Sequence, residues 1–484
     1  MINGIRMTQY FFDVTDLRNY LTFHTQVSGI QRVSISTIAR AREAIGPEQV
    51  WLSYYDPISN KYLACQCPKD LGINFLDPSD LSKVLDARLN LRTLPGMAQH
   101  RNSQARLQSR VILWDIRARL GETRYFKRYG TNRKAWLEAR AEYKAKQIEW
   151  KKDTVKIYRA NFQDVAKNGD HLVLLDNAWQ PAGLDHWLSK ASHQIGLSVT
   201  VLLHDLIPLV RPQYTTSSIC KKFHVWLRKS TKYVTKYIAN SQNTASDLHE
   251  FLKSVNASQP VSVVPLAQAQ LPKTQPVCTV QTGEPSSYAG FEQHLDLPDE
   301  IRVLVKTPYV LVVGTMEVRK NLWQLATVWD RLRKQPGRIL PKLVFAGRRG
   351  WLNDDFDILM SATGQLGGWV EIIEEPDDAV LDYLYRHCLF TMTTSFYEGW
   401  GLPIGESLSY VKTAVVSHTS SMPEVGADMV EYCDPHDMNS IEAACIRLID
   451  DEEYRELLEA RISVAHLRTW DDVAHDMLNV VLKT

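Results

Sequence analysis

A chain of 484 residues is too long for one hydrophobic core, so the sequence predicts two domains of similar size. Hydrophobic residues make up 44% of the chain and charged residues 23%, which excludes a mainly disordered or fibrous protein. The 56 basic and 55 acidic residues nearly cancel, so the net charge identifies no partner. Seven scattered cysteines without a Cys-x-x-Cys pair argue against a disulfide framework or a zinc ribbon.

The N-terminal segment from Met1 to Asp13 is too short and too polar for a signal peptide. No stretch approaches the roughly 18 uninterrupted apolar residues that a membrane-spanning helix needs. Together with the cysteine pattern, these features predict a soluble protein of the cytoplasm.

Basic residues are concentrated in one part of the chain. Between Arg88 and Arg159 there are 19 lysines and arginines and 6 acidic residues, a local net charge of +13. We expect a helical insertion over residues 85–160, broken near Pro95 and near Gly130. A stripe of large apolar residues recurs there at seven-residue spacing: Trp136, Tyr143, Trp150 and Ile157.

Three interpretations of this basic segment remain open. The stripe and its surrounding lysines suit the headgroup region of an anionic membrane, where an enzyme could stay beside a lipid-linked acceptor. The stripe could instead pack on the first domain while the charges are solvated. Contact with a polyanion is the third interpretation, although the segment carries no recognised nucleic-acid motif.

The first half of the chain alternates short apolar runs with amphipathic segments, which predicts strands and helices in turn. Its strands are expected at residues 10–14, 50–55, 171–176, 198–203 and 237–239, with helices around Ile35 and Ile38 and over 218–235. The runs at 171–176 and 198–203 are typical of buried parallel strands.

A segment rich in Pro, Gln, Thr, Gly and Ser follows, and we interpret residues 271–304 as a linker or surface excursion. The alternation then restarts, with strands expected at 309–313, 342–346, 370–373, 389–392 and 414–416 and helices from Asn321 and over 379–386. Two such blocks predict two doubly wound α/β domains, in which ligands bind beyond the carboxyl ends of the strands.

Residues that could bind a ligand follow the strand expected at 309–313. After the strand ending at Val313 come Gly314 and, at the start of the next helix, Arg319 and Lys320. A helix N-terminus favours anions, and two adjacent cations there would bind a diphosphate. A solvated basic turn is the alternative interpretation of this motif by itself.

Two glutamates flank a glycine-containing loop further on. Glu398 precedes Gly399-Trp400-Gly401, and Glu406 lies eight residues later, inside the helix expected to begin near Pro403. Eight positions along a helix span roughly 12 Å, whereas a glycosidase needs its carboxyl groups about 5–10 Å apart across one sugar. Two separate hydrogen-bonding roles along one extended ligand fit this spacing better than a hydrolytic pair.

Two further motifs allow both a functional and a structural interpretation. Small hydroxyl residues at 417–421 precede a Pro-Glu helix start and either contact a ligand or cap that helix. His204 follows the strand at 198–203 and is either a structural histidine or a group facing the ligand cleft.

Taken together, these motifs resemble the retaining glycosyltransferases of family 4, which have the GT-B fold. The resemblance is strongest from Tyr309 to Asp437, through Gly-Thr-Met-Glu-Val-Arg-Lys-Asn, the Glu-x(7)-Glu pair and Ser-Ser-Met-Pro-Glu-Val. It is thinner in the first half, at Ser28-Gly29-Ile30 and His204-Asp205-Leu206. It points to bacterial enzymes that build O-antigens, capsules and exopolysaccharides, many of which transfer mannose or rhamnose.

The resemblance implies a role for each site residue. Arg319 and Lys320 would hold the donor diphosphate, and Glu398 would bind the sugar hydroxyls. Gly314 and the backbone amides of Trp400, Gly401 and Leu402 would line the donor site. The remaining roles fall to Glu406 at the ribose, Gly29 beside the phosphates and His204 near the reacting carbon. Many relatives carry Gly-Gly where Ser28-Gly29 stands and Arg where Thr315 stands, so the phosphate contacts differ in detail.

The implied architecture is a first domain over residues 1–270, a second over 305–464, and a C-terminal helix over 465–484 that crosses back to the first. The implied reaction needs no protein nucleophile, cofactor or metal, and Asp355-Phe356-Asp357 is interpreted as a capped helix start. GDP-mannose is the favoured donor and a saccharide or lipid-linked saccharide the expected acceptor. The alternatives are a hydrolase or phosphorylase, or a degenerate relative that binds a polyanion or a membrane.

Overall fold

A computed structural model describes residues 6–24, 27, 29–56, 61–87, 91–97, 104–127, 131–152, 157–179, 184–269 and 297–482. Contacts divide the chain into two compact units. The first unit comprises residues 1–202, 229–236 and 481–484, and the second comprises residues 203–228 and 237–480. The domain boundaries expected at residues 270, 305 and 465 stay predictions. The part of the expected linker from residue 271 to residue 296 lies outside the described residues.

The first unit contains a mostly parallel sheet with the strand order β4-β3-β2-β1-β5-β6. Its parallel strands are β1 (Tyr10–Asp13), β2 (Val50–Asp56), β5 (His171–Leu174) and β6 (Ser198–Leu203), all at positions that the hydrophobic runs predicted. The antiparallel strands β3 (Lys61–Gln66) and β4 (Tyr158–Asn161), of which β4 forms the edge of the sheet, were not predicted. The residues of β4 are mostly exposed, so they show no apolar run.

Short helices connect the strands of this sheet: α1 (Thr15–Leu21), α2 (Gly29–Ile45), α3 (Pro78–Val84), α7 (Phe162–Val165) and α8 (Leu184–Ile195), with 3-10 turns at Lys69–Leu71 and Leu91–Thr93. The predicted helix around Ile35 and Ile38 is α2, in which both side chains are buried.

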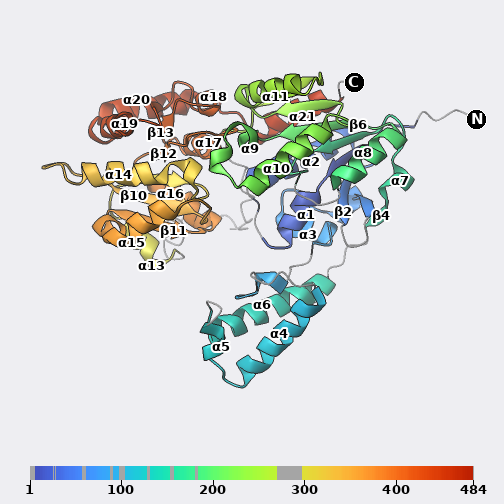
Figure 1. Ribbon diagram of the computed structural model, residues 1–484, viewed down its shortest axis with the longest axis horizontal. Coiled ribbons are helices and arrows are strands. Elements are labelled where there is room, and N and C mark those ends of the chain that lie inside the picture. Colours follow the sequence, from blue (N-terminus) through green and yellow to red (C-terminus); the bar gives the residue numbers. More distant parts are fainter. Residues whose placement is uncertain are drawn as a thin grey trace, which may run out of the picture. The chain divides into compact units, whose positions relative to one another are not determined.

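The basic segment forms the helices α4 (Gln104–Arg119), α5 (Arg124–Lys127) and α6 (Arg133–Lys152), confirming a helical insertion. Helices α4 and α6 lie side by side (Figure 1). They enclose a small core of their own, in which the Trp114 and Trp136 rings pack with centroids 4.7 Å apart. We call these three helices, residues 104–152, the helical insertion.

The described side chains of the seven-residue stripe face the inside of the protein, so the stripe itself is not the surface that would meet a membrane; whether another face of the insertion does so stays a prediction. Trp136 is completely buried, because it fills the core between α4 and α6. Tyr143 packs against the same core, and Ile157 is buried. The side chain of Trp150 lies outside the described residues.

The second unit contains a parallel sheet with the strand order β11-β10-β9-β12-β13-β14. Its strands are β9 (Tyr309–Val313), β10 (Lys342–Gly347), β11 (Val370–Glu374), β12 (Thr391–Thr393), β13 (Ala414–Ser417) and β14 (Glu431–Cys433). The strand predicted at 389–392 is shifted to Thr391, because Leu389 and Phe390 lie in the approach to the sheet.

Helices cover this sheet: α13 (Asp299–Leu304), α14 (Leu322–Leu332), α15 (Asp354–Gly368), α16 (Asp378–His387), α17 (Leu402–Ser409), α18 (Met422–Gly426), α19 (Met438–Asp450) and α20 (Glu452–Val464). The last helix, α21 (Trp470–Leu482), is separate from this sheet (Figure 1). The unit also holds β7 (Lys236–Ala239) from Tyr237 onward, β8 (Val261–Val263), α9 (Ile207–Val210), α11 (Gln242–Ser254) and most of α10 (Ser217–Ser230). The predicted fold class, two Rossmann-like α/β domains with parallel sheets, is confirmed. No helix in the described ranges is both long and apolar enough to cross a bilayer.

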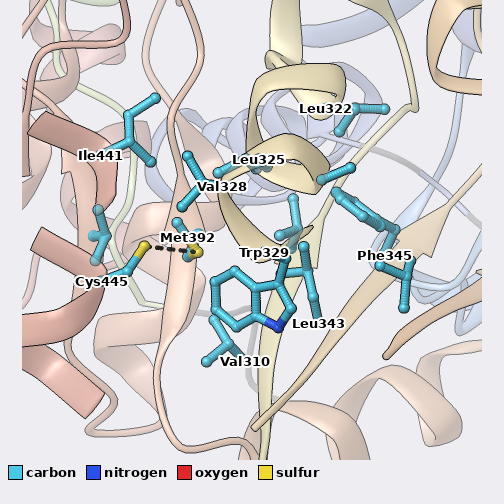
Figure 2. Packing of buried hydrophobic residues seen from close by; sticks show 14 of the residues in the cluster. Val310, Leu322, Leu325, Val328, Trp329, Leu343, Phe345, Met392, Ile441 and Cys445 are labelled. Atoms are coloured by element: carbon cyan, nitrogen blue, oxygen red, sulfur yellow. Dashed lines mark hydrogen bonds between the residues drawn. The ribbon is translucent and has the colours of Figure 1, made fainter. Parts of the chain in front are cut away.

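Trp329 of α14 lies at the centre of the main core of the second unit (Figure 2). Its ring packs among aliphatic side chains such as Val310 and Leu343, and it is completely buried. Its indole Nε1 donates a hydrogen bond of 2.9 Å to the Pro341 carbonyl. This core fixes the position of α14, whose N-terminus carries the candidate site.

We expect Trp329→Phe to lower the free energy of unfolding by about 1–3 kcal/mol, because it removes a buried hydrogen bond and leaves a small cavity. Trp323 belongs to the same helix but is 45% exposed, so Trp323→Phe is the matched control and should change stability by less than about 0.5 kcal/mol. Urea unfolding of both variants measures the difference, and equal losses would contradict this account of the core.

Candidate functional site

The loop after β9 forms the floor of the candidate site. Gly314 has a φ of +136°, a conformation that side chains other than glycine rarely adopt. A Cβ on Gly347 would lie 2.0 Å from the Gly314 carbonyl oxygen, so the ends of β9 and β10 approach as closely as glycine allows. The chain then passes through a 3-10 turn over Val318–Lys320 and enters α14. Arg319 and Lys320 therefore stand immediately before a helix start, as predicted.

Both cations converge on one carboxylate, Glu398, which follows β12. Arg319 Nη1 lies 2.6 Å from Glu398 Oε2, and Lys320 Nζ lies 2.6 Å from Glu398 Oε1. Ser395 Oγ also donates to Glu398 Oε1 at 2.7 Å. The other end of the Arg319 guanidinium pairs with Glu317, which the sequence analysis did not single out. The charge cluster thus joins three residues after β9 to one after the neighbouring strand β12.

The cluster is buried, so its charges interact strongly. The side chains of Arg319, Lys320 and Glu398 are 13%, 12% and 9% exposed. Burial alone would raise the pKa of Glu398, but the adjacent charges of Arg319 and Lys320 outweigh it and lower that pKa to about 2. The carboxylate pair likewise raises the pKa of Arg319 against the effect of its burial. Glu398 and Arg319 therefore stay ionised across the physiological pH range.

Hydroxyl groups from the loop after β13 hold the Glu398 loop in place. Ser421 Oγ donates to the carbonyls of Glu398, at 2.9 Å, and Trp400, at 3.0 Å. Ser420 Oγ accepts a hydrogen bond of 3.0 Å from the Glu398 amide, and Thr419 Oγ1 donates to the Phe396 carbonyl. These side chains position the loop that carries Glu398, a role that neither sequence interpretation included.

The His204-Asp205 segment lies directly against this loop. A Cβ on Gly399 would lie 1.9 Å from the His204 carbonyl oxygen, so only glycine permits the contact. Asn240 Nδ2 donates to the same carbonyl at 2.8 Å. Burial raises the pKa of Asp205, and the nearby positive charge of Arg319 partly counteracts this. The structure therefore brings the His204 backbone against Gly399, the residue after Glu398, and it adds Asp205 to the charged groups of the site.

The predicted helix after the glycine loop is α17, which begins at Leu402 with Pro403 in its first turn. Gly401 precedes it with a φ of +104°. The N–H groups of a helix's first turn have no partner inside the helix, so they are oriented toward the loop. Glu406 lies in the middle of α17, and its carboxylate accepts a hydrogen bond of 2.9 Å from the Tyr385 hydroxyl. Glu398 and Glu406 therefore have separate environments.

Residues from the first half of the sequence complete the surroundings of the loop. Asn243 Nδ2 donates to the Tyr397 hydroxyl at 2.7 Å, and that hydroxyl donates to Asp247. The Glu424 carboxylate accepts the Gln242 and Asn243 amides, at 2.8 and 3.0 Å, at the start of α11. The sequence did not predict these contacts.

Two expected residues stand apart from this cluster. Gly29 is the first residue of α2 in the first unit, so its role beside the phosphates stays a prediction. Asp357 lies in the first turn of α15, as expected, but its carboxylate pairs with Arg349 and does not cap the helix. Within the described ranges, no group of three or more His, Cys, Asp or Glu side chains is placed to hold a metal ion.

The arrangement combines an anion-binding turn with a fixed carboxylate. Arg319 and Lys320 provide positive charge at a helix start, where a phosphate would find additional backbone donors. Glu398, kept ionised by these cations, accepts hydrogen bonds and is suited to hydroxyl groups. A ligand that carries both phosphate and hydroxyl groups fits this combination.

Comparison with known proteins is consistent with that chemistry. Residues 297–462 match the family model described as Glycosyl transferases group 1. The O-antigen chain mannosyltransferase B of Escherichia coli is 34% identical over 172 residues, which are 35% of this chain and 45% of that protein. The serotype-specific mannosyltransferase WbdA of the same species is 22% identical over 49% of this chain and 28% of its own length. The chain thus spans less than half the length of these curated relatives.

Solved structures share the fold over nearly the whole chain. Sucrose-phosphate synthase from Thermosynechococcus elongatus has a TM-score of 0.55 at 14% identity and covers 98% of both chains. The Anabaena protein HepE, solved in complex with UDP, has a TM-score of 0.54 at 12% identity over 99% of this chain and 100% of its own. Similarity at this identity shows the GT-B fold of paired Rossmann-like domains and no more.

Proposed function

We propose that this protein is a glycosyltransferase of bacterial surface polysaccharide synthesis. The GT-B fold and the match of residues 297–462 to the glycosyl transferases group 1 family support this proposal. The protein transfers a hexose or deoxyhexose, with mannose favoured, from a nucleotide-diphosphate sugar to a saccharide or lipid-linked saccharide. The observation that carries the proposal is the buried cluster in which Arg319 and Lys320 meet Glu398 at the ends of β9 and β12. The mannosyltransferase relatives support the choice of sugar.

In the proposed mechanism, the cluster stabilises the negative charge that develops as the bond between the sugar and the diphosphate of the donor breaks. Cleavage of the glycosyl–phosphate bond places negative charge on the diphosphate, which Lys320 and Arg319 offset because they are already oriented and desolvated. Glu398 holds the sugar hydroxyls. The acceptor oxygen bonds to the anomeric carbon on the face that the phosphate leaves, and its proton passes to the departing phosphate oxygen. The configuration is then retained, with no metal or cofactor.

The remaining roles follow from position. Backbone amides of Trp400, Gly401 and Leu402 lie at the start of α17 and would contact the sugar and the phosphate. Glu406 would bind the ribose, exchanging or sharing its hydrogen bond from Tyr385. His204, beside Gly399, would lie near the reacting carbon. The protein would work in the cytoplasm, at or near the inner face of the membrane, without a nucleic-acid partner.

A calorimetric screen of GDP, UDP, dTDP and ADP tests the donor. We expect GDP to bind most tightly, with Lys320→Ala weakening its binding because a phosphate contact is lost. Tighter binding of UDP or dTDP would contradict the assignment of mannose as the transferred sugar, but it would still be consistent with a glycosyltransferase. Failure of all four nucleotides to bind would reject the transferase and favour a degenerate relative.

The product and its metal dependence test the reaction type. We expect the NMR spectrum of the product to show the anomeric configuration of the donor, and the rate to be nearly unchanged in EDTA. Inversion of configuration would exclude the retaining mechanism. A rate that collapses in EDTA and returns with Mg²⁺ would require a different means of stabilising the diphosphate.

A further inference from the structure

Helix α4 of the helical insertion has two apolar faces. One face packs into the small core of the insertion and is completely or almost completely buried: Leu107, Val111, Trp114 and Ala118. The other face is exposed to solvent: Ile112 (58%), Leu113 (43%) and Ile116 (49%), continued by Leu120 (78%), the residue directly after the helix. A surface helix of a globular domain needs only the first of these faces, so the second requires an explanation.

The positions along the helix show that the faces are separate. At about 100° per residue, the four buried residues fall within an arc of about 60°, and the four exposed residues fall within an arc of about 100° on the opposite side. The exposed arc has arginines at its borders, with Arg119 on one side and Arg106 and Arg117 on the other. The exposed residues therefore form one continuous stripe, which we call the outer face of α4.

The charge around the outer face identifies the kind of surface it fits. Arg106 and Arg119 are exposed, and exposed Arg124 follows at the start of α5. The acidic residue of α4, Asp115, is turned toward α6, where it accepts hydrogen bonds from Trp136 Nε1 at 3.1 Å and Arg140 Nε at 3.0 Å. The outer face thus combines aliphatic side chains with a positively charged border.

We propose that the outer face of α4 binds an anionic phospholipid surface, with the helix lying parallel to the membrane plane. Aliphatic side chains would enter the boundary between headgroups and acyl chains, while the bordering arginines would contact lipid phosphates. A nucleic acid would satisfy the arginines but leave the aliphatic stripe in water. If a second copy of this chain bound there through the same face, two arginine-bordered stripes would meet and their positive charges would repel each other. A lipid surface satisfies both parts of the face.

Flotation of the full-length protein with vesicles tests this proposal. We expect binding to vesicles of phosphatidylglycerol and phosphatidylcholine, decreasing as salt is added, and much weaker binding to pure phosphatidylcholine. The variant I112Q/I116Q/L120Q should lower the partition coefficient at least tenfold, because it removes three exposed aliphatic side chains. The variant R106Q/R119Q/R124Q should lower the partition coefficient by about fivefold for each charge that lies near the membrane surface. It should also weaken the salt dependence of vesicle binding.

The matched control replaces three exposed aliphatic residues elsewhere, as I339Q/I358Q/V464Q, and should float like the wild type. Near-ultraviolet circular dichroism of the Trp114–Trp136 pair confirms that the insertion stays folded. The proposal is overturned if the wild type ignores anionic vesicles at low salt, or if I112Q/I116Q/L120Q floats like the wild type. It is also overturned if light scattering shows a dimer that this variant dissociates. Nucleotide binding, measured separately, should be unchanged in all variants, so a failure of the proposed transferase would be distinguishable.

Discussion

Lys320→Ala and Glu398→Ala are each expected to reduce the rate of glycosyl transfer at least about a hundredfold, the loss typical of one oriented electrostatic contact in a transition state. Lys320 is the simpler case, because Arg319 remains 2.6 Å from Glu398 and continues to neutralise it. Removing the Glu398 carboxylate instead leaves two buried cations without their shared partner. We therefore expect Glu398→Ala also to lower the free energy of unfolding, by about 3–5 kcal/mol.

Steady-state kinetics and urea unfolding on the same preparations measure the two effects. Lys306→Ala and Glu453→Ala remove the same types of charge from exposed positions and should leave both quantities unchanged. Near-normal turnover by a folded Lys320→Ala protein would contradict the assignment of the cluster to the donor diphosphate. An unaltered unfolding free energy in Glu398→Ala would show that the carboxylate is not the centre of the ion cluster.

Acid is expected to remove the stabilisation that Glu398 provides. Its pKa is about 2 in the folded protein, against an ordinary value of 4.5, so its contribution is fully present above pH 4.5 and is lost as the pH falls toward 2. A difference of this size corresponds to about 3 kcal/mol, and the carboxylate is too buried for water to screen much of it. The stability advantage of the wild type over Glu398→Gln should therefore shrink across this interval.

The comparison with Glu398→Gln is needed because other buried carboxylates titrate as well. Asp13 in the first unit has its pKa raised to about 6 by burial, so its effect on stability has the opposite sign and is common to both proteins. Urea unfolding at several pH values between 5 and 3 gives the difference. If the wild type and Glu398→Gln lose stability in parallel, the cations do not lower the pKa of Glu398.

The sequence predicted the parts of the fold and the site that depend on local pattern. Continuous apolar runs located β1, β9 and β10 because buried parallel strands are apolar on both faces. The adjacency of Arg319 and Lys320, and the glycines around Trp400, located the charged turn and the loop because both are short contiguous motifs. The helices of the basic insertion were likewise predicted from their composition.

The sequence could not predict features that depend on which segments meet. Glu317 and Ser395 join the charge cluster only because the loops after β9 and β12 face each other, and neither belongs to a distinctive motif. The seven-residue aromatic spacing was a correct pattern, but it left open whether the stripe meets a membrane or packs inside the protein. Trp136 faces α4 and closes a small core, and periodicity alone cannot distinguish that face from one open to a membrane.

The contacts between residues 240–247 and the Glu398 loop have a consequence for protein engineering. Asn243 binds the Tyr397 hydroxyl, and the Glu424 carboxylate holds the first amides of α11, so segments about 150 to 180 positions apart form one packed substructure. A chimera that exchanges residues 297–462 with those of a related protein, but leaves residues 203–247 in place, would pair each loop with a foreign partner. Grafts of this part of the chain should therefore carry both segments from the same parent.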